Sequence, residues 1–281
     1  MKSKLICSLS VIALSVQVQA AVYSTNFESF DGSETGFVAG TSNAAFGWTT
    51  NDAPDLSPVL NWSPTLEPIL GYQAAAIGYY APGYSTLPSQ PTVDLSHSFG
   101  ETLITAGNTY SAHVDFDYQL SDSSSAQPNR DTFGISLTAT GGANIFQLHF
   151  TPMVVDAKNV WSVTYTVGGG GSGSLGYLNT NMDPSHMSVS FTGKDATSVY
   201  YHVTTPVTIS GVPTETTLSG TIPMAPGTMI DKFNMIWNLV DTANPGDNYL
   251  LLDNLVIVPE ASTSLLLCVA GMSLACRRKR A

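Results

Sequence analysis

Strict alternation of apolar and polar residues is the feature that most constrains the fold of this chain. The clearest case is residues 110–120, where one set of alternate positions is apolar and the other polar: Val114, Phe116, Tyr118 and Leu120 against His113, Asp115, Asp117 and Gln119. Successive side chains of a β-strand point to opposite faces of a sheet. The segment therefore predicts a strand with one face toward a core and the other toward solvent.

Similar short segments recur along the chain, separated by Gly, Pro, Asn and Ser. They predict further strands at 133–138, 145–150, 161–167, 187–192, 198–204, 216–222, 230–239 and 248–257. Many short period-two segments at close spacing are typical of an antiparallel sandwich or barrel. We expect an all-β fold with one β-sandwich domain over residues 21–257. The glycine-rich run 168–174 lies between two strand-like segments, so we interpret it as a hairpin tip rather than an interdomain linker.

The two ends of the chain predict export. Lys2 and Lys4 precede an apolar stretch, and Val18 and Ala20 are small or apolar residues at the two positions that a signal peptidase reads. Residues 1–20 are thus predicted to be a secretory signal peptide cleaved after Ala20. At the other end, the uncharged segment 262–276 is followed by basic residues at 277–280. Fifteen helical residues span about 22 Å, so this predicted transmembrane helix is short and relies on the basic cluster to hold its cytoplasmic end.

The tail 258–281 resembles the PEP-CTERM sorting signal of bacterial proteins sent to an exosortase. The resemblance lies in a short polar motif, the helix and a basic end: Val258, Pro259, Glu260, Ala261, Ser262, Arg277, Arg278, Lys279 and Arg280. It implies an exported protein at the cell envelope or cell surface, with a sorting enzyme as partner. A buried core helix is the alternative. Ala261 stands where the second proline of the motif normally lies, which leaves cleavage of the tail open.

The charge limits the classes of binding partner, and the cysteine content limits the possible disulfide bonds. From Ala21 to Glu260 there are four Lys and Arg residues against all 21 Asp and Glu residues, a difference of −17. Such a surface repels nucleic acid and anionic membranes and attracts divalent cations. The same stretch has no cysteine, so we expect no disulfide framework despite the oxidising compartment.

The segments at the two ends of the predicted sandwich, 25–28 and 249–257, resemble the first and last strands of jelly-roll carbohydrate-binding modules, as does the turn at 108–110. The resemblance implies a jelly-roll sandwich and a structural calcium ion between the terminal strands. Its ligands would be Glu28, Asp253 and Asn26, because calcium takes several oxygen ligands. The alternative is that these acids are ordinary solvated residues at strand ends.

Aromatic residues gather in the Pro- and Gly-rich segment 52–92, which we interpret as a long irregular insertion. A saccharide platform is predicted there from Trp62, Tyr79, Tyr80 and Tyr84. Exposed rings stack on the apolar faces of sugars, and long loops on rigid sheets often carry binding surfaces. The alternative is that these rings cover the insertion against the sheet.

Two further groups of polar residues are candidates for a binding or catalytic site. His113, Asp115 and Asp117 share a strand face and could bind a metal ion or a sugar, or act as acid and base. An ordinary solvent-facing strand surface is the alternative. Gln147-Leu148-His149 is similar to a Gln-Ile-His element of some alginate lyases. With Arg130 as the one arginine of the body, however, a cleft for an anionic polysaccharide is hard to build. No catalytic motif is present, so we expect no enzyme.

These observations favour an exported, envelope-anchored, non-catalytic surface or extracellular-matrix protein that associates with polysaccharide, with calcium in its fold. A purely structural matrix protein without a sugar site is the alternative. A polysaccharide-degrading enzyme ranks third.

Overall fold

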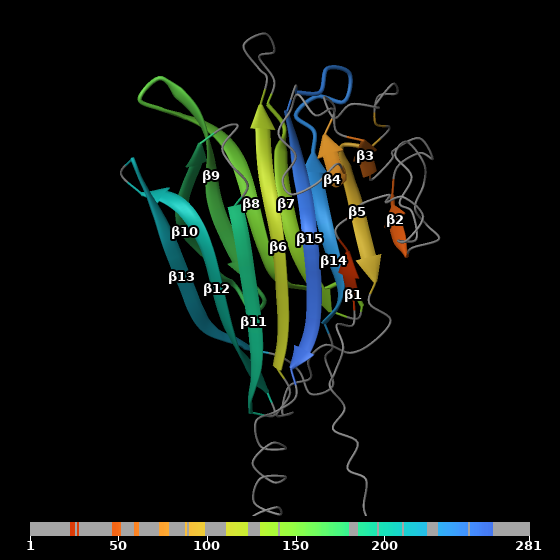
Figure 1. Cartoon of the computed structure of the whole chain (residues 1–281), viewed down its shortest axis with the longest axis vertical. Coiled ribbons are helices and arrows are strands. Elements are labelled where there is room, and N and C mark those ends of the chain that lie inside the picture. Colours follow the sequence, from red (N-terminus) through yellow and green to blue (C-terminus); the bar gives the residue numbers. More distant parts are fainter. Residues whose placement is uncertain are drawn as a thin grey trace, which may run out of the picture.

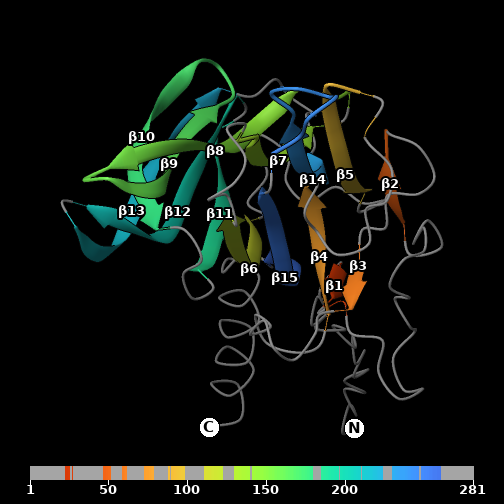
Figure 2. The ribbon, with the colours of Figure 1, turned by 90° about the horizontal axis from the view of Figure 1, so that it is seen from above.

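The computed structural model describes residues 23–25, 27, 47–51, 59–61, 73–78, 88, 90–98, 111–122, 130–139, 141–179, 185–195, 197–209, 211–223, 230–246 and 248–260. Nearly all of them belong to one continuous 15-stranded sheet that curls over on itself (Figure 1). Figure 2 shows the two resulting layers, with β6, β15 and β4 in one and β7, β14 and β5 in the other. No helix within the described ranges is long and apolar enough to cross a membrane.

The layer that contains β6 is called the front sheet and its partner the back sheet. The front sheet consists of β1 (Tyr23–Thr25), β3 (Val59–Asn61), β4 (Gln73–Gly78), β6 (Ser111–Asp122), β11 (Ser185–Asp195), β12 (Ser198–Ile209), β13 (Val212–Pro223) and β15 (Asn248–Glu260). The back sheet consists of β2 (Trp48–Thr50), β5 (Thr92–Ser98), β7 (Thr132–Ala139), β8 (Asn144–Val155), β9 (Lys158–Val167), β10 (Gly171–Asn179) and β14 (Ile230–Asn238).

The order of the strands is that of a jelly roll. Four neighbours in the front sheet run β4–β15–β6–β11, and four in the back sheet run β5–β14–β7–β8. The chain changes sheet at each step from β4 to β7 and again from β14 to β15, which gives two interlocked antiparallel sheets. β12 and β13 widen the front sheet, and β9 and β10 widen the back sheet. The predicted all-β antiparallel sandwich is confirmed.

The sequence pattern also places the individual strands. Each segment predicted from 110–120 to 248–257 lies within or overlaps a described strand. The glycine-rich run is a hairpin connection, as expected: a turn at 168–170 leads into β10, and Gly171 pairs with Val167 of β9. The run's second half is therefore strand rather than loop.

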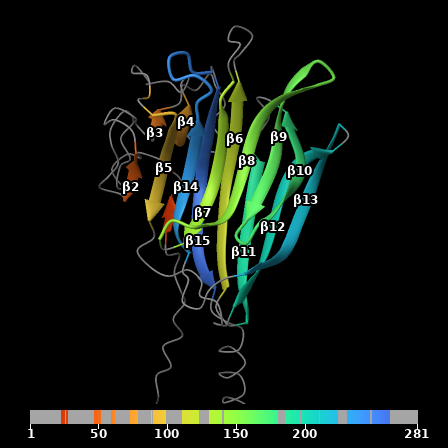
Figure 3. The same ribbon diagram turned by 180° about the vertical axis from the view of Figure 1, so that it is seen from behind.

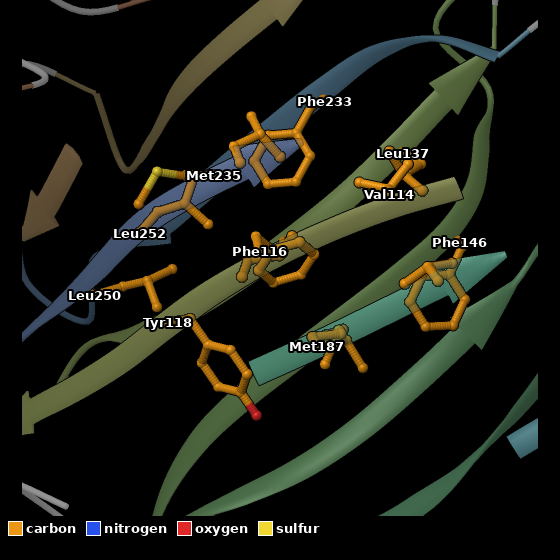
Figure 4. Packing of buried hydrophobic residues seen from close by; sticks show 14 of the residues in the cluster. Val114, Phe116, Tyr118, Leu137, Phe146, Met187, Phe233, Met235, Leu250 and Leu252 are labelled. Carbon is orange, nitrogen blue, oxygen red and sulfur yellow. The ribbon is translucent and has the colours of Figure 1, made fainter. Parts of the chain in front are cut away.

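The core fills the space between the sheets. Val114, Phe116 and Tyr118 of β6 are at most 1% exposed, and Figure 4 shows them among side chains from both layers. The Phe116 ring lies 5.6 Å from that of Phe233 in β14, and the Tyr118 ring lies 5.5 Å from that of Phe150 in β8. Ring pairs at these distances add to the stabilisation from apolar burial. All described strands lie between Tyr23 and Glu260, so residues 21–260 include every strand that the structure describes.

One buried carboxylate ties the end of the back sheet to the front sheet. Asp131, just before β7, is 0% exposed. Its side chain accepts hydrogen bonds at 2.9 Å from Trp237 Nε1 and from the backbone N–H groups of Val240 and Gly246. The Asn248 amide also donates to the Asp131 backbone carbonyl at 2.9 Å. The connection from β14 to β15 is thereby held against the start of β7.

Asp131→Ala is expected to lower the free energy of unfolding by about 3 to 5 kcal/mol, because three donors, two of them buried, lose their acceptor. Urea denaturation followed by tryptophan fluorescence measures this change. The matched control is Glu215→Gln on exposed β13, which removes one negative charge and should stay within about 0.5 kcal/mol of wild type. Equal effects of the two substitutions would contradict the role assigned to Asp131.

A histidine is buried among aromatic rings at the N-terminal end of the sandwich. His97 of β5 is 6% exposed and stacks on Tyr23 with ring centroids 3.8 Å apart. The Trp48 ring lies 5.3 Å away, and the Trp48 Nε1–H donates to the Tyr23 hydroxyl at 2.8 Å. Burial lowers the pKa of His97 to about 4, and a backbone hydrogen bond with Gly47 offsets part of that effect.

This shift predicts a pH-dependent stability. The unfolded chain binds a proton at the ordinary histidine pKa of 6.5, whereas folded His97 stays neutral down to about pH 4. The contribution of neutral, buried His97 to the free energy of unfolding is therefore fully present above pH 6.5. It is lost progressively as the pH falls from 6.5 to 4. Melting temperatures measured from pH 8 to pH 4 should fall less steeply for His97→Phe, which keeps an aromatic ring but no titratable group. Identical profiles would show that His97 does not cause the fall.

Candidate functional site

Polar side chains collect on the outer face of the front sheet. Because Val114, Phe116 and Tyr118 point into the core, the alternate residues of β6 point outward, as the sequence predicts. The antiparallel register with β11 sets Ser188 opposite Asp115 and His186 opposite Asp117. Side chains of opposite residues share a face, so β6 and β11 together build one polar surface.

Four of these residues form a connected group, which we call the His–Asp cluster: His113, Asp115, Asp117 and His186. His113 Nε2 lies 2.7 Å from Asp115 Oδ2, and His186 Nδ1 lies 2.8 Å from Asp117 Oδ1. His186 Nε2 lies 3.6 Å from the second oxygen of Asp115. The side chains are accessible, from 13% for Asp117 to 61% for His186. Each histidine thus contacts a carboxylate on the rigid face of two paired strands.

A neighbouring strand completes the support of Asp117. Asn254 of β15 donates from Nδ2 to Asp117 Oδ2 at 2.8 Å, so both oxygens of this carboxylate are held. Asn254 has a φ of +49°, a left-handed conformation that asparagine tolerates better than most residues. The register with β6 shifts between Asp253 and Val256 at the same point. This irregularity in β15 directs the amide toward the cluster.

The polar surface continues across β12 and β13. Adjoining rows of the register contribute further outward side chains, and together with the cluster they form what we call the polar face: Ser188, Ser190, Thr192, Tyr200, His202, Thr204, Thr217, Ser219 and Thr221. Tyr200 is 50% exposed, and Lys194 Nζ lies 5.1 Å from its ring centroid. The face combines an accessible aromatic ring, hydroxyl groups and ordered carboxylates.

The register also sets the size of the polar face. His202 lies opposite Ser190, which lies opposite His113, and Tyr200 lies two residues along β12 from His202. With strands about 4.8 Å apart and about 3.4 Å per residue, the Cα atoms of Tyr200 and His113 are roughly 12 Å apart. A ligand that contacts both must be longer than one sugar ring.

Of the three predicted calcium ligands, the structure describes Asp253. Asp253 lies in β15 between the segment that pairs with β4, through Leu252, and the segment that pairs with β1, from Leu255. It is 1% exposed, and its Oδ1 accepts the backbone N–H of Asn254 at 2.7 Å. Asn26 and Glu28 lie outside the described residues. Within the described ranges, no three His, Cys, Asp or Glu side chains are grouped as metal ligands.

Most of the other predicted site residues are not among those that the structure describes. Trp62, Tyr79, Tyr80 and Tyr84 lie outside the described residues, as do Ala20, Ala261, Ser262 and the segments 262–276 and 277–280. The first three residues of the sorting motif are described. Val258, Pro259 and Glu260 end β15 and pair with His113, Ala112 and Ser111 of β6. The sheet thus continues three residues into the predicted tail.

The lyase-like element lies on the outer face of the back sheet. Asn144 Nδ2 donates to Gln147 Oε1 at 2.9 Å, Gln147 Nε2 lies 3.4 Å from His149 Nδ1, and His149 Nε2 lies 3.3 Å from Thr166 Oγ1. Burial lowers the pKa of His149. Arg130 lies over the Trp161 ring, 5.7 Å from its centroid. The amide, imidazole and hydroxyl groups of this row are therefore engaged with one another.

Sequence reasoning found three of the four residues of the His–Asp cluster and missed His186 and the supporting Asn254. Period-two alternation identified His113, Asp115 and Asp117 as neighbours on one face. His186 is 69 residues from Asp117 and Asn254 is 137 residues away. Alternation predicted the strand at 187–192, but nothing in it indicates that this strand pairs with β6.

Comparisons with known proteins found solved structures of similar fold. No protein-family model matches the chain, and no curated protein matches it. Similar solved structures include carbohydrate-binding and lectin-like domains as well as alginate lyases. The CBM2 module of the evolved Dit of Lactobacillus casei BL23 phage J-1 is 14% identical, with 86% of this chain and 96% of that chain covered and a TM-score of 0.40. The Lotus tetragonolobus seed lectin is 10% identical, with 85% and 97% covered and a TM-score of 0.43. The metal-free Emp46p carbohydrate recognition domain has the same four values. At these scores the likeness carries no functional argument, and the jelly-roll assignment comes from the strand order.

Asp117→Asn is expected to lower the free energy of unfolding by about 1 to 2 kcal/mol, because asparagine offers one acceptor oxygen where His186 and Asn254 need two. Urea denaturation near neutral pH measures the effect. Thr192→Ala changes an exposed residue of the same face and should stay within about 0.5 kcal/mol of wild type. An unchanged midpoint for Asp117→Asn would mean that these two contacts do not order the cluster.

Proposed function

We propose that this protein is an exported, non-catalytic surface protein that binds a polysaccharide on the polar face of its front sheet. The observation that carries the proposal is that the half-exposed Tyr200 ring shares one accessible sheet face with the ordered carboxylates of Asp115 and Asp117. Sugars are bound by rings that stack on their apolar faces and by polar groups that hydrogen-bond their hydroxyls. Both kinds of group project from rigid strands, where side chains are held more precisely than on loops.

The dimensions of the face favour a polymer over a single sugar. The roughly 12 Å between Tyr200 and His113 spans several adjoining register positions. Serines and threonines fill the positions between these two residues, so hydrogen-bonding groups are available along the whole path. A chain of sugar units can contact the ring, the hydroxyls and the carboxylates at once.

The charge of the protein favours an uncharged polymer. The stretch from Ala21 to Glu260 has 17 more acidic than basic residues. On the polar face, Lys194 contributes one positive charge beside Tyr200. An acidic polysaccharide would meet long-range repulsion, which salt only partly screens.

Calcium belongs to the proposal as a structural ion. Asp253 with Asn26 and Glu28 would supply carboxylate and amide oxygens next to the pairing of β1 with β15. Because Asn254 follows Asp253 directly and contacts Asp117, an ion held there would also stabilise the His–Asp cluster.

The two ends of the chain would determine where the protein is located. We propose that residues 1–20 direct export and that the tail 258–281 acts as a PEP-CTERM-type signal for an exosortase. Before any processing, the helix at 262–276 would hold the protein in the membrane at the cell envelope, with the polar face outside. This location would bring the protein into contact with extracellular polysaccharide.

The test uses residues 21–260 in a binding screen against neutral and acidic polysaccharides, first with calcium and then after chelation. We expect saturable binding to a neutral polymer. Tyr200→Ala should weaken it about tenfold, equivalent to about 1.4 kcal/mol. Thr166→Ala, an exposed change on the back sheet, is the control and should bind as wild type does.

A parallel variant, Tyr80→Ala, separates the polar face from the aromatic residues of the insertion. Loss of binding with Tyr80→Ala but not with Tyr200→Ala would move the site to that segment. No binding by the folded protein would overturn the proposal and favour a purely structural matrix role. A loss of binding on chelation would assign calcium to the bound state.

A further inference from the structure

β13 forms an exposed edge of the front sheet. It pairs with β12 along its whole length, from Val212 opposite Ile209 to Pro223 opposite Ser198, and with no other strand in the described part of the chain. Figures 1 and 3 show it at the outer margin of the molecule from both sides. Residues 212–215 and every second residue from 217 to 223 are exposed. Most of this 12-residue strand is thus exposed, except at its C-terminal end, where Ile222 is buried and Pro223 lies beside Gly169 of the β9–β10 turn.

Stereochemistry shows which backbone groups that edge presents. Ile209 and Val212 close a hairpin with two residues between them, and the residues that flank such a loop form a hydrogen-bonded pair. Even-numbered residues of β13 therefore bond to β12, and odd-numbered residues direct their backbone groups to the free edge. Pro213 and Pro223 are both odd-numbered, so their missing N–H groups cost β12 nothing. The free edge retains the N–H and C=O groups of Glu215, Thr217, Ser219 and Thr221.

The centre of the edge lacks the features that usually prevent strand pairing. Exposed edges are commonly protected by charged residues, by proline, by a bulge or by short length. β13 is 12 residues long, has no register shift against β12 and carries one charged residue, Glu215. Its prolines lie at the two ends and leave the central edge open. The strand is rich in threonine, which favours an extended backbone.

We propose that a second copy of this chain occupies this edge, by antiparallel pairing of β13 with β13 about a twofold axis at Leu218. In this register Pro213 lies opposite Pro223 of the second copy, so residues without an N–H meet each other at both ends. Glu215 lies opposite Thr221, and Thr217 lies opposite Ser219. These four odd-numbered residues and their symmetry mates exchange about eight backbone hydrogen bonds.

Side chains suit the same arrangement. Leu218 is a partly buried residue packed against the core, and the twofold axis brings two copies of it together. Like charges do not meet, because Glu215 faces Thr221 rather than itself. Thr221 is paired with Tyr200, over which Lys194 lies. Each Glu215 thus lies opposite the part of the second copy that carries Lys194. One charge of opposite sign on each copy supports this occupant over an unrelated strand.

Sedimentation of residues 21–260 over a range of concentrations tests the proposal, and a monomer–dimer equilibrium is expected. Thr217→Pro removes one free-edge N–H per copy but none that bonds to β12, so the fold should survive. It should raise the dimer dissociation constant at least roughly tenfold, because two symmetry-related hydrogen bonds are lost. Thr217→Val keeps the N–H and is the matched control, which should dimerise as wild type does. A wild-type protein that stays monomeric, or a Thr217→Pro dimer of unchanged affinity, would overturn the proposal.

Cysteine substitution tests the register and does not depend on the proline variant. Residues 21–260 contain no cysteine, so any disulfide comes from the introduced residue. Leu218→Cys would meet its own copy in a non-hydrogen-bonded pair, with Cα atoms about 4.5 Å apart, within disulfide range. Mild oxidation should yield a covalent dimer on a non-reducing gel. Thr221→Cys is the control: its copies would lie about 20 Å apart along the strands and should not link. A reversed result would exclude this pairing.

Discussion

The packing of β6 against the back sheet is the contact on which the other features depend. Phe116 and Tyr118 meet Phe233 and Phe150 across the core, and this fixes which face of β6 points inward. A shift of one residue in register would bury Asp115 and Asp117 and expose the aromatic rings. Stability and site geometry are therefore set by the same strand. The energy that orders the His–Asp cluster comes largely from apolar side chains on the opposite face.

Much of the fold could be predicted from the sequence because each strand carries its own local pattern. Alternation around Phe116 requires neither a partner strand nor a long-range contact to be recognised. The same holds for the predicted strands at 161–167 and 230–239, in which Trp161 and Trp237 are fully buried. The glycine-rich hairpin was also predictable, since two strand-like segments flank it.

The pairing of strands could not be predicted in this way. His186 reaches Asp117 because β11 lies beside β6, and Asn254 reaches it through an irregularity of β15. Both depend on the complete topology and leave no local trace in the sequence. Asp131 is a further case: an acid before a strand suggests a solvated turn, yet it is buried and accepts three hydrogen bonds. The aromatic residues chosen from composition lie outside the described residues, so that prediction stands untested.

The length of β15 has a mechanical consequence. This strand runs to Glu260, with β6 on one edge and with β4 and β1 on the other. A pull on the chain beyond Glu260 would act along the strand axis, across hydrogen bonds that lie perpendicular to it. Those bonds would be loaded together in shear rather than opened one after another. A protein held through that end would resist force better than one whose last strand could be peeled from the edge of its sheet.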